Sequence, residues 1–322
     1  MNRIKTFIVA EAGSNHNNNL NTAKRLIKIA KDVGADAIKF QLFSGTKLYS
    51  KKDKRSRLMK KFELKSSWVK ELVRYSKKNK IFFFASPFDN DSVDILIKNK
   101  VKIIKIASPE IRDDLLIEHI AKKKVFTIIS TGVSTIKEIL NAKKIINKYH
   151  NNLAILQCSS IYPCDANNLN LNIIKEYKKL FPKNIIGFSD HSLNTISPVV
   201  AVALGARIIE KHFTLSNKQN GPDHKISIEP NKFADMVKSI RIAENSFGKS
   251  KKKILKKESL KNHTKTFFTK KFIKKGSRLS EKNIELLRSS IGIKNSFLRK
   301  VIGKTTRQDL KDGELIKWKF LK

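Results

Sequence analysis

The chain of 322 residues has only two cysteines, Cys158 and Cys164, and this scarcity argues against a framework of disulfide bonds. Its 12 glycines are too few for a collagen-like chain. No apolar run approaches the roughly 20 residues that a membrane-spanning helix needs, and the apolar segment after the opening residues is too short for a signal peptide. We therefore expect a cytoplasmic protein with no membrane partner.

Acidic residues are also few, because 28 Asp and Glu face 68 Lys and Arg, a formal net charge of +40. Such a field attracts phosphates, acidic glycans or nucleic acid, and it says nothing about the fold. One interpretation is a noncatalytic barrel that binds an anionic polymer. The lysines are spread over predicted helices and a linker without interleaved aromatic residues, which favours a solvated surface and no nucleic-acid partner.

Short apolar runs rich in β-formers recur along the first two thirds of the chain. They lie at 7–13, 37–41, 81–86, 103–108, 126–131, 154–158, 185–190 and 207–214. Amphipathic segments with helical spacing separate most of them, as at 21–34 and 66–79. Near-continuous apolar strands alternating with such helices predict a parallel sheet covered on both faces. Eight units in 1–248 predict one closed (β/α)8 barrel, the TIM barrel.

The chain changes character after Gly248. Residues 249–265 are dense in lysine and lack strand character, so we interpret them as a solvated basic linker. Residues 266–322 combine short β-like runs with glycine turns at Gly276 and Gly313. This pattern predicts a small β-rich second domain.

Polar and ionisable residues stand at or just past the end of each predicted strand. They include Glu11, Lys39, Gln41, Ser86, Lys105, Ser108, Ser130, Thr131, Cys158, Ser160, Ser189, Asp190, His191, Glu210 and His212. A barrel builds its active site at that rim. Polar residues also begin wherever a strand ends, so a single position carries little weight.

His191 and His212 follow the seventh and eighth strands, which are neighbours in a barrel. Their imidazoles could bind one divalent cation and leave positions open for substrate and water. The alternative is two separate histidines that satisfy backbone groups. We expect the adjacent acids Asp190 and Glu210 to orient the two rings.

Lys39 and Lys105 end the second and fourth strands, close to Ser86, Ser108 and Ser130. Burying an inward-facing lysine is costly unless an anion pairs with its ammonium group. This favours a phosphate or carboxylate ligand. The alternative is that both side chains extend to the rim. Glu11 and Asp223 then supply groups able to handle protons.

Taken together, these residues resemble the sialic acid synthase family, which condenses phosphoenolpyruvate with an N-acetylhexosamine. The motifs that carry the resemblance occur in family order. They are AEAGSNHN at 10–17, KFQ at 39–41, SPFD at 86–89, KIAS at 105–108, STG at 130–132, IYP at 161–163, SDHS at 189–192, IEKHFT at 209–214 and GPDHKIS at 221–227. Residues 302–316 resemble the antifreeze-like SAF domain that closes the family.

The resemblance implies a role for each matching position. His191 and His212 would bind Mn²⁺, or Mg²⁺ or Co²⁺, and Glu110, Tyr162 and Asp223 would contact the amino sugar. The positions matching phosphoenolpyruvate contacts are Lys39, Ser86, Lys105, Ser108, Ser130, Ser160 and Ser189, although Ser160 replaces the family's usual asparagine. Glu11 would serve as a catalytic group.

The resemblance further implies a domain-swapped homodimer, in which the tail of one subunit brings an arginine to the partner's barrel. Arg288 is the best match, but Ser289 and Lys294 replace the prolines of that region. Two sugars are candidate substrates, N-acetylmannosamine and a 2,4-diacetamido-dideoxy hexose. A pseudaminic acid synthase is the alternative, while the GPDHKIS segment is closer to the neuraminic and legionaminic branch.

Overall fold

The computed structural model describes residues 5–248, 251 and 263–322, and the chain forms two compact units that divide between Gly248 and Lys249. Most of the predicted linker at 249–265 lies outside the described residues. Each unit is described by itself. Within the described part of the chain, no helix is long and apolar enough to cross a membrane.

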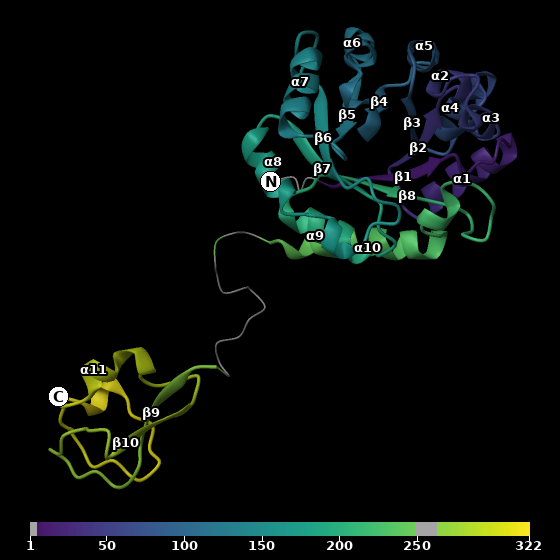
Figure 1. Ribbon diagram of the computed structural model, residues 1–322. Helices are drawn as coiled ribbons and strands as arrows, with labels where there is room; N and C mark the ends of the chain where they lie inside the picture. Colours follow the sequence, from purple (N-terminus) through teal and green to yellow (C-terminus); the bar gives the residue numbers. More distant parts are fainter. Residues whose placement is uncertain (1–4, 249–250, 252–262) are drawn as a thin grey trace. The chain divides into compact units, whose positions relative to one another are not determined.

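The first unit is a closed barrel of eight parallel strands in sequential order (Figure 1), which confirms the predicted TIM barrel. The strands are β1 (Phe7–Gly13), β2 (Ala37–Leu42), β3 (Phe82–Pro87), β4 (Ile103–Ile106), β5 (Phe126–Ser130), β6 (Leu153–Cys158), β7 (Ile185–Asp190) and β8 (Ile208–His212). Parallel pairing of β1 with β8 closes the ring, so all eight carboxyl ends meet at one rim.

Helices surround the barrel and connect its strands (Figure 1). They are α1 (Leu20–Asp32), α2 (Gly45–Leu48), α3 (Lys54–Lys60), α4 (Val69–Lys78), α5 (Asn90–Lys98), α6 (Asp114–Lys122), α7 (Ile136–Asn147), α8 (Ile173–Leu180), α9 (Ile196–Leu204) and α10 (Pro230–Ser246), with a short 3-10 helix η2 (Ser108–Arg112) after β4. Further 3-10 helices lie at Ser66–Trp68 (η1), Ala166–Asn168 (η3) and His224–Ile226 (η4).

Helix α1 shows why these segments fold as they do. Its buried residues Ala23, Leu26, Ile27 and Ala30 follow the helical repeat and form one apolar stripe. The side chain of Asn19 accepts a hydrogen bond from the Thr22 amide and caps the first turn. The stripe packs on the sheet, while lysines of the opposite face lie in solvent.

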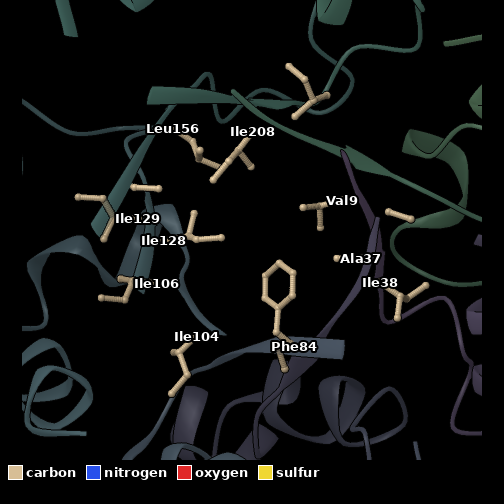
Figure 2. Close-up of a cluster of buried hydrophobic side chains, with 14 of the residues drawn as sticks. Val9, Ala37, Ile38, Phe84, Ile104, Ile106, Ile128, Ile129, Leu156 and Ile208 are labelled. Carbon is tan, nitrogen blue, oxygen red and sulfur yellow. The ribbon is translucent and has the colours of Figure 1, made fainter. Parts of the chain in front are cut away.

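Side chains alternate between the two faces of each strand, and this period of two builds layers inside the barrel. Figure 2 shows Val9, Phe84, Ile128, Leu156 and Ile208 pointing into the enclosed space, where they form an apolar layer. Two residues further along the same strands stand the next inward side chains, which are mostly polar. They are Glu11, Ser86, Ser130, Cys158 and Glu210.

On β7 the apolar layer requires a glycine. A Cβ at Gly187 would lie 2.4 Å from Cδ2 of Leu156 and 2.5 Å from the carbonyl oxygen of Ile208. Both distances are far shorter than van der Waals contact, so any side chain here would push β7 away from its neighbours. Two residues later, Ser189 belongs to the polar layer above.

The second unit is a small β-rich domain with its own core, as predicted. Strands β9 (Lys265–Thr269) and β10 (Ile284–Arg288) pair antiparallel, and helix α11 (Leu298–Val301) follows. Short 3-10 helices lie at Asn295–Phe297 (η5) and Trp318–Phe320 (η6). The buried core consists of Phe267, Ile273, Leu279, Ile284, Ile293, Val301, Leu310, Ile316 and Leu321.

Candidate active site

A cavity of about 130 Å³ lies at the carboxyl ends of the strands, directly above the apolar layer. Its lining includes most of the residues that the sequence pointed to. They are Glu11, Lys39, Ser86, Lys105, Ser108, Ser130, Tyr162, Ser189, His191 and His212. Gln41, Phe88, Ala107, Pro109, Cys158 and Glu210 complete the lining.

Two lysines and two carboxylates form a buried ionic cluster in this cavity. Nζ of Lys39 lies 2.7 Å from Oε2 of Glu11 and 3.7 Å from Oε1 of Glu210. The same Oε1 of Glu210 accepts hydrogen bonds from Nζ of Lys105 at 3.2 Å and from the Ser189 hydroxyl at 3.0 Å. Glu210 therefore contacts both lysines and fixes the position of their ammonium groups.

The environment separates the pKa values of the two carboxylates. Burial raises the pKa of Glu11 to about 7, against the opposing effect of Lys39. Burial also disfavours ionised Glu210, but Lys105 and Lys39 together outweigh it and lower its pKa to about 2. The two carboxylates thus differ in direction, with the pKa of Glu210 far below neutral pH and that of Glu11 close to it.

The two lysines also differ. Burial is the largest influence on each ammonium group and acts to lower its pKa. For Lys39 the attraction of Glu11 and Glu210 overcomes burial, and the pKa is raised. For Lys105 burial prevails and the pKa is lowered.

Small polar groups surround the lysines and leave room for an anion. The Gly132 amide donates to the Ser108 hydroxyl at 3.0 Å, and a Cβ on Gly132 would lie 2.9 Å from that oxygen and 2.1 Å from the Ser160 hydroxyl oxygen. The Ser130 hydroxyl is buried and has no hydrogen-bond partner among the described residues. A buried hydroxyl without a partner is costly, and a bound oxyanion would satisfy it.

The rings of His191 and His212 converge, with centroids 5.4 Å apart. Two imidazoles on one cation would lie roughly 4.5–5.5 Å apart, given metal–nitrogen distances of about 2.1 Å. Nδ1 of His191 donates to the Ser159 carbonyl at 2.7 Å, which leaves the lone pair of the neutral ring on Nε2. The described residues offer no partner to the buried Nδ1 of His212, and burial lowers the pKa of this ring to about 3.

These features fit a divalent cation held by the two imidazoles. Burial acts to lower the pKa of His191, but Cys158 and the Ser159 carbonyl outweigh burial and raise it, so a cation would compete with a proton for this ring. The described residues contain no group of three or more His, Cys, Asp or Glu side chains arranged to hold a metal ion. Any cation here would therefore take its remaining ligands from substrate and water, as a Lewis-acid site does.

The expectation that Asp190 and Glu210 orient the histidine rings is wrong. Asp190 pairs instead with Lys211, with Oδ2 and Nζ 2.6 Å apart, and Glu210 pairs with the cavity lysines. The backbone carbonyl of Ser159 orients His191. The period of two explains the error for Asp190, because Asp190 and His191 are successive residues and do not point to the same side. Glu210 shares the inward face with His212 but is bound by the two lysines instead.

Tyr162 covers the histidine pair. Its ring centroid lies 4.1 Å from that of His191 and 6.1 Å from that of His212. Half of the Tyr162 side chain remains exposed, so the ring stands at the mouth of the cavity. It is the only predicted sugar contact among the residues that line the described cavity.

Four predicted site residues stand outside the cavity lining. Oδ2 of Asp223 accepts hydrogen bonds from the Ser14 amide at 3.0 Å and hydroxyl at 2.8 Å. Glu110 is half-buried in η2, and burial, with a smaller contribution from Asp113, raises its pKa. Ser160 packs against Gly132, and Arg288 is an exposed residue at the end of β10 in the second unit.

Sequence reasoning missed the central place of Glu210 and the contributions of Phe88 and Pro109 to the lining. The alternation along β8 was the available signal, because it places Glu210 on the same face as His212 and therefore inward. Phe88 and Pro109 follow β3 and β4 and carry no chemistry that would have singled them out.

Comparison with known proteins extends over both units. The model of the NeuB family matches residues 26–252, and the SAF domain model matches residues 264–322. An N,N'-diacetyllegionaminic acid synthase of Campylobacter jejuni is 38% identical, covering 97% of this chain and 99% of that protein. A pseudaminic acid synthase of the same species is 36% identical, covering 97% and 96%.

Among solved structures, an N-acetylneuraminic acid synthetase from Leptospira borgpetersenii, in complex with citrate, superposes with a TM-score of 0.75. It is 36% identical and the match covers 78% of this chain and 88% of that one.

Proposed function

The chain belongs to the NeuB family, and on that premise we propose that it condenses phosphoenolpyruvate with an N-acetylated hexosamine to give a nine-carbon nonulosonic acid and inorganic phosphate. The observation that carries the proposal is the ionic cluster of Lys39 and Lys105 with Glu11 and Glu210, beside two converging histidines. Such a site suits a small, highly charged substrate that reacts with a polarised carbonyl group.

The anionic end of phosphoenolpyruvate would bind at the two lysines. Lys39 and Lys105 would exchange part of their contact with Glu210 for the phosphate or carboxylate oxygens. The unpartnered Ser130 hydroxyl and the hydroxyls of Ser86, Ser108 and Ser189 line the same cavity and would complete the anion contacts.

His191 and His212 would hold a divalent cation, with Mn²⁺ the first choice and Mg²⁺ or Co²⁺ alternatives. A cation bound there supplies a Lewis acid for the aldehyde oxygen of the open-chain sugar. The low pKa of His212 keeps its ring neutral, as a metal ligand must be.

We assign to Glu11 the role of catalytic group beside the reacting carbon atoms. Attack of C3 of phosphoenolpyruvate on the aldehyde carbon leaves positive charge at C2, water adds there, and phosphate then leaves with cleavage of its C–O bond. An ionised Glu11 would stabilise the charge at C2 or accept the proton of the water. Its pKa of about 7 suits a group that exchanges a proton near neutral pH.

For the sugar we propose N-acetylmannosamine or a 2,4-diacetamido-dideoxy hexose. A relative 38% identical is named a legionaminic acid synthase, while one at 36% is named a pseudaminic acid synthase, so the pseudaminic precursor is the second candidate. Tyr162 at the mouth of the cavity would contact the sugar, and Glu110 and Asp223 would do so from the adjoining loops.

We also propose a domain-swapped homodimer, in which Arg288 of one subunit reaches the N-acyl group of the sugar bound in its partner. Arg288 is exposed and no ion pair holds it among the described residues, so it is able to serve a partner's site.

Phosphate release from phosphoenolpyruvate by the purified protein tests the proposal. The sugars would be N-acetylmannosamine, its 6-phosphate, and the 2,4-diacetamido-dideoxy hexoses that lead to legionaminic and pseudaminic acids. We expect release with one sugar, dependent on Mn²⁺ and abolished by chelation.

His212→Ala is the matching variant, and we expect it to lose the metal-dependent reaction while keeping its fold. Near-normal activity of His212→Ala with Mn²⁺ would refute the two-histidine metal site. Absence of release across the panel, from folded and dimeric wild-type protein, would count against the proposed substrates.

A further inference from the structure

A third buried lysine, Lys211, stands between Glu210 and His212 on β8. Successive strand residues point to opposite faces, so Lys211 points away from the cavity that its two neighbours line. Its side chain is only 1% exposed, as deeply buried as the cavity lysines. No step of the proposed reaction uses it.

The Lys211 ammonium group binds the segment that follows β7. It donates to Oδ2 of Asp190 at 2.6 Å, to the Ser192 hydroxyl at 3.1 Å and to the Asn194 carbonyl at 3.0 Å. It also donates to the Ser192 carbonyl oxygen. Oδ1 of Asp190 in turn accepts from the Ser192 amide at 2.8 Å.

These contacts enclose His191 from both sides, because Asp190 precedes it and Ser192 follows it. Lys211 itself is covalently joined to His212. One side chain thus connects the backbone around His191 to the residue next to His212. Asn194 extends the connection to helix α9, since its side-chain oxygen accepts from the amides of Ile196 and Ser197.

A buried ion pair is weak support for stability, because apolar residues of the same size often serve as well or better. Its usual advantage is a defined geometry, since an ammonium group bonded to several fixed acceptors tolerates little movement. Here the fixed acceptors belong to one loop, and that loop carries His191.

We propose that Lys211, together with Asp190, is a positioning residue that sets the spacing of His191 and His212 for cation binding. The inference rests on the proposed function, because it takes the two histidines as the cation site. It adds a residue pair that never touches substrate and determines how tightly the cation is bound.

The test compares three variants of the full chain. Asp190→Asn/Lys211→Met removes both charges and avoids leaving one of them buried alone. Ser192→Ala removes one acceptor, leaves both charges in place and reports on the same loop if the double variant fails to fold. Asp32→Asn/Lys28→Met is the matched control, because it removes an exposed pair with the same 2.6 Å separation on α1.

Two measurements are made on each variant: the affinity for Mn²⁺ alone, by titration calorimetry, and hydrogen exchange of the amides at 191–195. We expect the double variant to bind Mn²⁺ about 10- to 100-fold more weakly, the range found when residues that orient metal ligands are replaced. We also expect faster exchange in that loop, a smaller change of the same sign in Ser192→Ala, and no change in the control.

A merely structural role would lower the melting temperature and leave the Mn²⁺ affinity of the folded protein unchanged, and that result would overturn the inference. Wild-type protein that does not bind Mn²⁺ would refute the metal site itself, and the role of Lys211 with it. Wild-type binding matched by the folded variants would refute only the role of Lys211.

Discussion

Glu11 and Glu210 are chemically identical side chains in one cavity, yet their pKa values lie at about 7 and about 2. The difference arises from position, because Glu210 contacts two ammonium groups and a hydroxyl, whereas Glu11 contacts one ammonium group and, at 3.4 Å, the side-chain amide of Gln41. Pairs of titratable groups driven apart in this way divide the roles of an active site between them. Glu210 becomes a fixed counterion and Glu11 the group able to exchange a proton.

We therefore predict that kcat/KM for phosphoenolpyruvate depends on the ionisation of Glu11. Both roles assigned to this carboxylate need the ionised form, so kcat/KM should rise with pH through about 7 and then level off. Glu11→Gln should lower kcat roughly 10²- to 10⁴-fold and remove the inflection. Steady-state phosphate release between pH 5.5 and 8.5 checks both.

Glu210→Gln is the control for that experiment, because its pKa of about 2 lies far below the measured range. It should weaken the site and move the inflection to lower pH without removing it, because the charge of Glu210 contributes to the raised pKa of Glu11. An unaltered inflection in Glu11→Gln would assign the ionisation to another group.

The sequence located the residues of the cavity better than their partners. Lys39, Lys105 and the histidines were recognisable because each lies within or just after an apolar strand, and the carboxyl ends of the strands meet at one rim. Two contacts depend on side-chain directions across neighbouring strands. They are the binding of both lysines by Glu210 and the ion pair of Asp190 with Lys211. No single strand contains that information.

At the scale of elements, two features place the side chains of the barrel. Side chains alternate between the two faces of each strand, and the register pairs residues of neighbouring strands. Ser189 is paired with Glu210 across β7 and β8, and Asp190 with Lys211 one residue later. The first pair faces the cavity and the second faces away, so one pair of strands builds both the ionic cluster and the Lys211 contacts. The expected strands matched the observed ones within one to two residues, because each contains a short apolar stretch that stands out from the polar segments around it.

We predict that Gly187→Ala destabilises the barrel and disturbs its active site together. The added Cβ would meet Leu156 and the Ile208 backbone well inside van der Waals contact, and overpacking of this kind costs about 1–3 kcal/mol. The displacement of β7 would carry Ser189 away from Glu210. Urea unfolding and phosphate release measure the two effects.

Ala154→Gly, on the inward face of β6 one layer before Leu156, is the control, since it removes an atom and adds none. It should lose some stability and keep most of the activity. A Gly187→Ala protein with wild-type stability would show that the layer accepts an extra methyl group.

At the scale of the whole molecule, two units with separate cores share one chain. The core of the first fills the barrel and its helix layer, and that of the second is a distinct cluster around Phe267 and Leu310. The sequence predicted both units from their different patterns of apolar residues. It could not show whether the second unit completes the site of its own chain or that of a partner chain. The same two cores are buried in either case.

We predict that two inactive variants complement each other. In the proposed domain-swapped dimer, an Arg288→Ala chain keeps an intact barrel, and a Glu11→Gln chain keeps an intact tail. Dimers mixed from the two then contain one complete site, so refolding them together should restore phosphate release that neither shows alone. Titrating one variant against the other, with analysis of oligomeric state, checks this.

Arg299→Ala, which changes another arginine of the second unit, serves as the control and should stay active alone. If the mixture of the two inactive variants stayed inactive although mixed dimers had formed, each tail would be serving its own barrel.

The three buried lysines give this lysine-rich chain a built-in reporter of its own folding. Among the described residues, Lys39, Lys105 and Lys211 are the lysines whose side chains are buried. An amine-reactive label should modify the surface at many positions and leave these three unmodified. Lys39 and Lys105 border a cavity, so a bound anion should shield them further, whereas Lys211 should react only when the barrel opens. Peptide mass spectrometry of the labelled protein would then distinguish an occupied, an empty and an unfolded barrel in one sample.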